Sequence, residues 1–361
     1  MKIVNRYIAV EFIKLLLIIS AGLTILYMVA DIFENLGDFT RTHTDFFITA
    51  EFFLLRFPQA IYYIAPITLL FAAFLNLGLF TKYNELTAMR SGAINIINIA
   101  SSMLIITFLF SIGMFFLNET VIPFSNKLSE EIKRQIENKP REMFFKEDSL
   151  WFKSGKYTLY NVRFVDPEKN ILWRINVYHL THEFQIEESI SAEKAISQNG
   201  QWFLQSGVRR IFNSSNIPVT VYIFDKLPVA IPFDLKDVKH AVVRASETRF
   251  GTLKNYIERI ERDGYDVKRL NVELYEKTSF PFSGFILTLI GISLAFYIKK
   301  FGGIASGIGI CIVVSILYWV FFSLSIHMGY AGYLPPVLSA WLANLFFLCT
   351  GGFLFFKATK I

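Results

Sequence analysis

Long stretches without charge are the feature that most restricts the fold of this 361-residue chain. A helix needs about 20 apolar residues to cross the roughly 30 Å of bilayer hydrocarbon. Five tracts without Asp, Glu, Lys or Arg meet or approach this length: 15–30, 57–81, 91–118, 278–298 and 301–356. The last is too long for one span, and Gly329 to Pro336 gives a turn signal near its middle. The sequence therefore predicts six membrane-spanning helices, at about 11–32, 57–80, 95–118, 279–298, 303–327 and 334–356.

Charged residues are concentrated between the third and fourth of these spans. Residues 119–278 contain 25 of the 36 Lys and Arg residues and 23 of the 30 Asp and Glu residues, although the whole chain is 53% hydrophobic. This distribution predicts spans one to three in 1–118, a large soluble domain in 119–278 and spans four to six in 279–361. Basic residues do not cluster with interleaved aromatics, so the net charge of +6 does not indicate a nucleic-acid partner.

Lys and Arg residues in short loops favour the cytoplasmic side of a membrane. With the N-terminus inside, the outer short loops hold only Arg41 and Arg56. The cytoplasmic side then collects Lys2, Arg6, Lys14, Lys82, Arg90, Lys299, Lys300, Lys357 and Lys360. Both termini are therefore predicted to be cytoplasmic and the large domain extracytoplasmic. The first apolar stretch is interpreted as an uncleaved span, because no small-residue cleavage site ends it.

The inserted domain changes from helical to β patterning along its length. Residues 119–140 continue the third span as a polar helix, and alternation with period two then predicts about eight short strands over about 140–250. Asn199-Gly200 is a hairpin signal, and a short amphipathic helix is expected at 252–263. The expected fold class is thus an α-helical integral membrane protein with an extracytoplasmic all-β domain, jelly-roll-like, between helices 3 and 4. This domain could be a spacer or docking module, or a groove for an apolar ligand.

Motifs for catalysis and metal binding are missing from the sequence. Gly155-Lys156 lacks the glycine spacing of a phosphate-binding loop, and His182-Glu183 is not completed to a zinc motif. No nucleophile elbow occurs, so we expect a non-catalytic chain without a metal or a bound cofactor. Cys311 and Cys349 lie in apolar stretches and are interpreted as packing residues rather than a disulfide, as is His327 in the fifth span.

Four segments in order resemble the permease subunits of the lipopolysaccharide export ABC transporter (LptF/LptG, formerly YjgP/YjgQ). They are Asn5–Phe12 (NRYIAVEF), Tyr83–Gly92 (YNELTAMRSG), Leu117–Pro123 (LNETVIP) and Gly332–Asn344 (GYLPPVLSAWLAN). With the arrangement of three spans, insert and three spans, the resemblance covers the whole chain. Length and the N-terminal pattern lean toward the LptG member.

The resemblance implies a permease subunit that takes lipopolysaccharide from the bacterial inner membrane and passes it through a periplasmic jelly roll. Implied partners are a cytoplasmic ATPase dimer (LptB-like) that uses ATP-Mg, a paralogous permease (LptF-like), and jelly-roll subunits, one a periplasmic carrier and one membrane-anchored (LptA/LptC-like). The alternatives are an ABC permease for another lipid or lipoprotein, and a membrane-anchored scaffold or sensor. The first rival usually has four spans with its soluble domain after the first, and the second needs no inward coupling loop.

The inward loop after span two is the expected contact with the ATPase. Glu85 and Arg90 flank the apolar Leu86 and Met89 in a short helix that also includes Ala88. One face of this helix could therefore enter a groove of the ATPase, while the two charged side chains contact the edge of that groove. The resemblance also implies that spans one and five line the lipid path or gate, where we single out Tyr27, Gly303, Gly307 and Trp319. The small residues Gly303 and Gly307 permit close helix approach. Tyr27 replaces a lysine that is frequent at this place in the family.

Recognition of an anionic head group calls for basic residues at the outer membrane surface. The candidates are Lys133 and Arg134, with Arg41 and Arg56 as further choices. Within the predicted jelly roll, Leu159, Phe164, Val177 and Phe203 are the expected lining of a groove for acyl chains.

Overall fold

A computed structural model describes most of the chain, and its contacts divide it into two compact units. Unit 1 comprises Met1–Glu137 and Ala245–Ile361, and unit 2 comprises Asn138–Arg244. The residues described are 2–41, 45–92, 95–136, 143–146, 149–154, 156–166, 171–198, 201–213, 217–229, 231, 248–262, 266–297 and 302–359.

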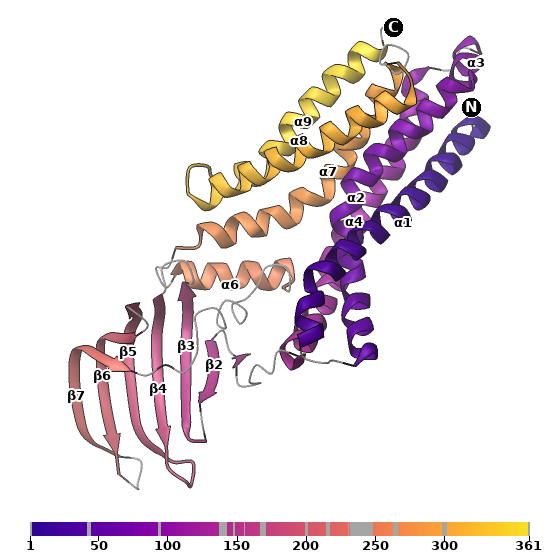
Figure 1. The fold of residues 1–361 in the computed structure, drawn as a ribbon. Helices are drawn as coiled ribbons and strands as arrows, with labels where there is room; N and C mark the ends of the chain where they lie inside the picture. The colour runs from indigo at the N-terminus through magenta and orange to yellow at the C-terminus, as the bar shows by residue number, and fades with distance from the viewer. Residues whose placement is uncertain are drawn as a thin grey trace. The chain divides into compact units, whose positions relative to one another are not determined.

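Unit 1 is helical (Figure 1). Its helices are α1 (Lys2–Arg41), α2 (Phe46–Lys82), α3 (Glu85–Ser91), α4 (Ile96–Ile136), α6 (Phe250–Arg262), α7 (Lys268–Phe296), α8 (Ile304–Tyr330) and α9 (Pro336–Thr359). Six of the described helices are long and apolar enough to cross a membrane, namely α1, α2, α4, α7, α8 and α9. The predicted number of spans and the insertion between the third and the fourth are confirmed.

Three of the spanning helices are longer than a bilayer requires. α1 has 40 residues, α2 has 37 and α4 has 41. At about 1.5 Å per residue each of them is roughly 60 Å long, about twice the hydrocarbon thickness. A substantial part of each helix must therefore lie outside the hydrocarbon, and the polar continuation expected after the third span belongs to the same helix as that span.

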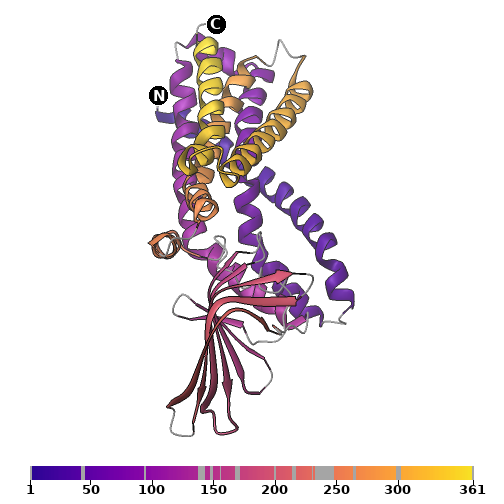
Figure 2. The same cartoon turned by 90° about the vertical axis from the view of Figure 1, so that its left-hand side faces the viewer.

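Helices α2 and α7 form the centre of the bundle. α2 packs against α1, α4, α7 and α8, and α7 packs in addition against α4, α8 and α9 (Figures 1 and 2). Glycine allows the closest approach between the two central helices: a Cβ atom on Gly291 would lie 2.5 Å from the carbonyl oxygen of Leu70. The other spans leave many apolar side chains exposed on their outer faces, as expected for helices that contact lipid or other chains.

Unit 2 is one antiparallel sheet in which every strand pairs with its neighbours in sequence, from β1 to β7 (Figure 2). The strands are β1 (Met143–Lys146), β2 (Ser149–Ser154), β3 (Thr158–Asp166), β4 (Ile171–Leu180), β5 (Ile186–Gln198), β6 (Gln201–Phe212) and β7 (Pro218–Val229). The prediction of an all-β, jelly-roll-like insert is confirmed. Gln198 pairs with Gln201 around the predicted hairpin turn, and Asn199 and Gly200 themselves lie outside the described residues.

A crease runs across five strands of this sheet. In each neighbouring pair of strands from β3 to β7, the backbone pairing skips one residue on each strand. The skipped residues lie side by side across the sheet and form the crease: Arg163, Arg174, Glu193, Ser206 and Asp225. Arg174 and Ser206 adopt positive φ values of 49° and 53°. Side chains three apart therefore reach the same face, which explains why Leu172 and Ile175 are both fully buried. Strict alternation does not hold across the crease, because a left-handed residue inverts the pleat.

Candidate functional sites

The loop after the second span forms the short helix α3. Asn84 makes the turn into it with a φ of 60°, a conformation that asparagine tolerates better than most residues. Glu85 lies in the first turn and Arg90 in the last, which matches both charges to the helix dipole. Thr87, Ala88 and Arg90 are exposed to solvent.

The apolar side of α3 faces its own bundle. Leu86 is only 6% exposed and belongs to the core of unit 1, and Met89 packs against the same core. Leu86 therefore packs within its own chain, and the prediction that α3 contacts a partner rests on the other side of this helix. Burial of these residues fixes α3 to the bundle and leaves Thr87, Ala88 and Arg90 as its outward surface.

Tyr7 joins the start of α1 to this helix. Its hydroxyl donates a hydrogen bond to Glu85 Oε2 at 3.0 Å, and its ring stacks on Phe80 of α2 with a centroid separation of 5.5 Å. Sequence reasoning did not assign Tyr7 to the coupling site. The available signal was that Tyr7 and Glu85 belong to two separate segments that both carry the family resemblance.

The residues proposed for the lipid path do not share one surface. Gly307 of α8 faces α2, where an added Cβ would lie 2.1 Å from Phe74 Cζ. Trp319 packs on Phe280 of α7 with a ring separation of 5.6 Å. Gly303 is the N-cap of α8, with open space around it, and Tyr27 is a half-buried residue of α1. Gly307 and Trp319 thus hold α8 to its own chain.

Two other surfaces fit a lipid path better, because they are apolar and exposed. On α8 the exposed side chains recur at helical spacing and include Ile312, Val313, Ile316, Leu317, Val320 and Leu324. On α1 they are Leu17, Ile18, Ile25, Leu26, Val29 and Phe33. In a membrane these faces contact lipid or another chain.

A polar cluster joins α1, α2 and α4 where two of the head-group candidates lie. Arg56 Nη2 donates to Asp31 Oδ1 at 2.7 Å, and Asp31 is only 5% exposed. Asn35 donates to the carbonyl oxygen of Asp31 at 2.8 Å and accepts from Lys133 Nζ at 3.3 Å. The side chains of the other candidates, Arg41 and Arg134, lie outside the described residues.

Replacing Arg56 by alanine should destabilise the protein. The buried Asp31 carboxylate would lose its ion-pair partner, and removing one partner of a buried pair costs about 3–5 kcal/mol. Because the Arg56 side chain is 28% exposed, we expect a loss near or below the lower end of that range. Thermal denaturation of the purified protein measures the loss. Combining Arg56→Ala with Asp31→Asn should recover most of it, and an equally unstable double variant would contradict the explanation.

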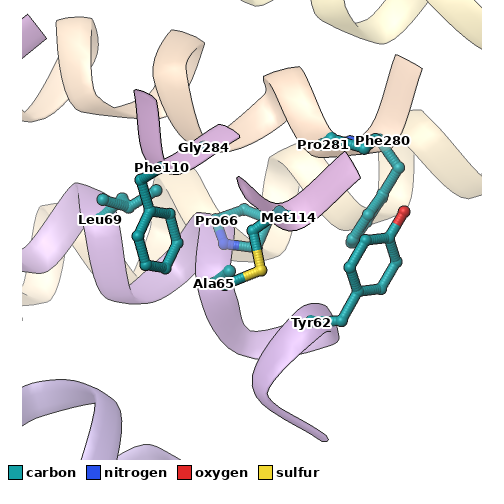
Figure 3. Close-up of a pocket in the computed structure, with 9 residues that line it drawn as sticks. All are labelled: Tyr62, Ala65, Pro66, Leu69, Phe110, Met114, Phe280, Pro281 and Gly284. Atoms are coloured by element: carbon teal, nitrogen blue, oxygen red, sulfur yellow. The ribbon is translucent and has the colours of Figure 1, made fainter. Parts of the chain in front are cut away.

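A small apolar pocket lies where α2, α4 and α7 meet (Figure 3). Pro66 of α2 and Pro281 of α7 both contribute to it, and each proline removes one helical hydrogen bond. Tyr62, Ala65, Leu69, Phe110, Met114, Phe280 and Gly284 complete the lining. Sequence reasoning did not predict this pocket.

The four residues proposed to line a jelly-roll groove are divided between the two faces of the sheet. Val177 is fully buried in the sheet's apolar cluster and pairs with Tyr160, whereas Leu159 pairs with Tyr178 on the opposite face. Phe203 also lies opposite that cluster, where Lys226 Nζ is 4.1 Å from its ring centroid. Phe164 pairs with Trp173, but its side chain lies outside the described residues.

The apolar face of the sheet has a different membership, determined by the crease. Its buried residues include Tyr160, Val162, Leu172, Ile175, Val177, Ile190 and Leu204. Phe224, Leu227 and Val229 of the edge strand β7 pack beside them and are only partly buried. On the outer side of β7, Val219, Val221 and Ile223 are apolar and exposed as well.

The fold and these sites define a class: a multi-pass membrane protein whose helical bundle is interrupted by an all-β domain. The sequence model of the family described as lipopolysaccharide export system permease LptF/LptG matches residues 6–357 of this chain. The chain therefore belongs to this family. The match does not separate the two members. The family is a permease component of a transporter and not an enzyme family. A comparison with curated proteins finds no match.

Proposed function

We propose that the chain is a permease subunit of an ABC transporter that extracts lipopolysaccharide from the bacterial inner membrane and passes it to the periplasm. The observation that carries the proposal is the family match over residues 6–357, joined to a bundle whose insert has an apolar sheet face. Both termini are then cytoplasmic and the β-domain periplasmic. The partners are a second, paralogous permease, a cytoplasmic ATPase dimer that uses ATP-Mg, and jelly-roll subunits that receive the lipid.

The exposed side of α3 is the proposed contact with the ATPase. Thr87, Ala88 and Arg90 face outward, while Leu86 anchors the helix. A rigid anchor suits this role, because motion of the partner is transmitted only through an element that cannot rotate freely. Glu85, held by Tyr7, lies at the junction of α3 and α1 and links the two.

The proposed lipid path runs along the exposed apolar faces of α1 and α8. Moving acyl chains into water costs about 0.8 kcal/mol per CH₂, so extraction of a lipid with several chains requires a sheltered apolar route. Tyr27 lies on α1 within this route. Lys133, Arg134 and Arg41 are the proposed head-group anchors. Arg56 is a weaker candidate than its position suggests, because its charge is already paired with Asp31.

The apolar sheet face is the proposed continuation of the path, and β7 is the proposed contact with a matching jelly roll. β7 is an edge strand, so one row of its backbone groups has no partner strand in the described sheet. Its outer side chains are apolar and exposed, with Val219 at 66% and Ile223 at 84%. An edge with these properties pairs readily with a strand of another chain.

Site-specific photo-crosslinking tests the proposal at two neighbouring residues. A photoreactive residue at Phe224, on the apolar face, should capture lipopolysaccharide in cells, and so should one at Val177. A probe at Ile223, on the opposite face of the same strand, is the matched control and should capture little. Capture from Ile223, Leu159 or Phe203 but not from Phe224 and Val177 would contradict a lipid path on this face. Capture of no lipid, or of a different one, would favour a scaffold or a permease for another substrate.

A further inference from the structure

A single carboxylate joins two helices that are far apart in sequence. Glu119 of α4 accepts a hydrogen bond from the backbone N–H of Phe250 at 2.8 Å, and Phe250 is the first residue of α6. The N–H groups in the first turn of a helix have no partner within the helix, and the positive end of the helix dipole favours a carboxylate there. Glu119 therefore binds the one end of α6 that can hold a negative charge.

The remaining contacts of α6 show that it is docked on the bundle. Leu253, Tyr256 and Ile257 are buried at 0%, 7% and 2% exposure, and they share one face at spacings of three and four residues. Lys254 and Glu258 on the other face are exposed. α6 packs against α7 and belongs to the same compact unit as the membrane-spanning helices.

A buried lysine on α7 supplies the second observation. The ammonium group of Lys277 on α7 is buried and makes no hydrogen bond within the described residues. Oε1 of Glu119, the carboxylate oxygen that does not bind Phe250, is also buried and makes no hydrogen bond there. Glu119, Glu273 and Glu276 are the acidic residues close enough to act on the charge of Lys277. Because charges inside a membrane protein are costly, buried ionisable groups of this kind indicate a function more often than a packing accident.

The order of these helices along the chain indicates what the contact between Glu119 and α6 does. α4 is the last helix before the inserted β-domain, α6 is the first helix after it among the described residues, and α7 is the span that follows. We propose that Glu119 is a positioning residue that fixes α6 to α4. The two chain segments that lead into and out of the β-domain are thereby held at one point of the bundle, and lipid export requires this attachment.

Cysteine labelling in membranes tests the attachment without measuring transport. In full-length protein carrying Cys311→Ala and Cys349→Ala, Ile257→Cys should react slowly with a water-soluble maleimide because the position is buried. Glu119→Ala should speed the reaction about tenfold, as expected for the loss of a charge-assisted hydrogen bond, and Glu119→Gln, which keeps an acceptor oxygen, about two- to threefold. Gly251→Cys, exposed and surrounded by open space, should react rapidly in every variant.

Two further variants distinguish the loss of α6 docking from a general destabilisation of the protein. Glu258→Ala removes an exposed carboxylate of α6 and should change neither labelling nor export. Glu119→Leu combined with Lys277→Met removes both buried charges together, so it should release α6 while the bundle stays folded. The amount of each variant in the membrane and its thermal denaturation are measured alongside.

Export is measured in cells where this chain is the only copy, and the role of α6 in export rests on the proposed function. Faster labelling together with lost export, partly restored in Glu119→Gln, supports the proposal. Unchanged labelling in Glu119→Ala overturns it whatever the export result. Faster labelling with normal export of lipopolysaccharide overturns the role in transport. If the parent protein exports no lipopolysaccharide, it is the proposed function that fails, and the labelling result still decides the attachment.

Discussion

Changing Glu85 to arginine should abolish lipid export and lipid-stimulated ATPase activity, while the protein still inserts into the membrane. The substitution reverses the charge in the first turn of α3 and places a cation at the positive end of the helix dipole. Leu86 remains buried, so α3 should stay attached to the bundle. Glu85 borders the outward surface of α3, and a loss of about 2 kcal/mol at the ATPase contact would weaken binding roughly thirtyfold.

Glu85→Arg also removes the hydrogen bond between Tyr7 and Glu85, and Tyr7→Phe is the control for that loss. It deletes the hydroxyl that donates to Glu85 and leaves the ring that stacks on Phe80. A single exposed hydrogen bond contributes about 1 kcal/mol or less, so this variant should keep most of its activity. Co-purification of the cytoplasmic ATPase and of a second permease chain is compared between the variants. Normal transport by Glu85→Arg would remove α3 from the coupling mechanism.

Replacing Gly307 by alanine should lower the thermal stability of the isolated chain. An added Cβ would overlap the Phe74 ring, whose position is fixed because the ring is fully buried. Overpacking of this kind costs about 1–3 kcal/mol. Gly309→Ala, two residues further along α8, meets open space and should leave stability unchanged or slightly higher, since alanine favours helix.

The same pair of variants separates two interpretations of Gly307. If Gly307 packs α8 onto its own chain, the alanine variant is destabilised as a single chain in detergent. If Gly307 served instead as an adjustable contact with a second permease, the single chain would be unaffected and only the association of the two chains would weaken. Thermal denaturation of the chain alone, followed by pull-down of the partner, decides between them. We expect the first result.

Much of the architecture follows from the distribution of charge along the chain. The six spans and the site of insertion are determined by where charged residues are missing, because a helix in hydrocarbon cannot expose them at low cost. The β character of the insert follows from alternation with period two. The family relationship was predictable too, since its segments are contiguous in sequence.

The candidate sites were less predictable, because each depends on contacts between distant segments. The sequence indicates that Leu86 and Met89 share a face of a short helix, but whether that face turns inward or outward depends on what the bundle offers to bury. The sequence does not show that Asp31 forms an ion pair with Arg56, which lies 25 residues further along the chain. Glu119 was visible only as part of a segment typical of the family, and its contact with Phe250 spans 131 residues.

The sequence by itself determined which segments cross the membrane and which fold as β-strands, because hydropathy and periodicity are local properties that each segment carries alone. The tertiary structure decided which side chains are accessible. In the sheet, the left-handed residues Arg174 and Ser206 invert the pleat, so Leu172 and Ile175, three residues apart, both face the apolar cluster, while Phe203 does not. That inversion is stable only when neighbouring strands make it at the same level, and the pattern of a single strand cannot show this.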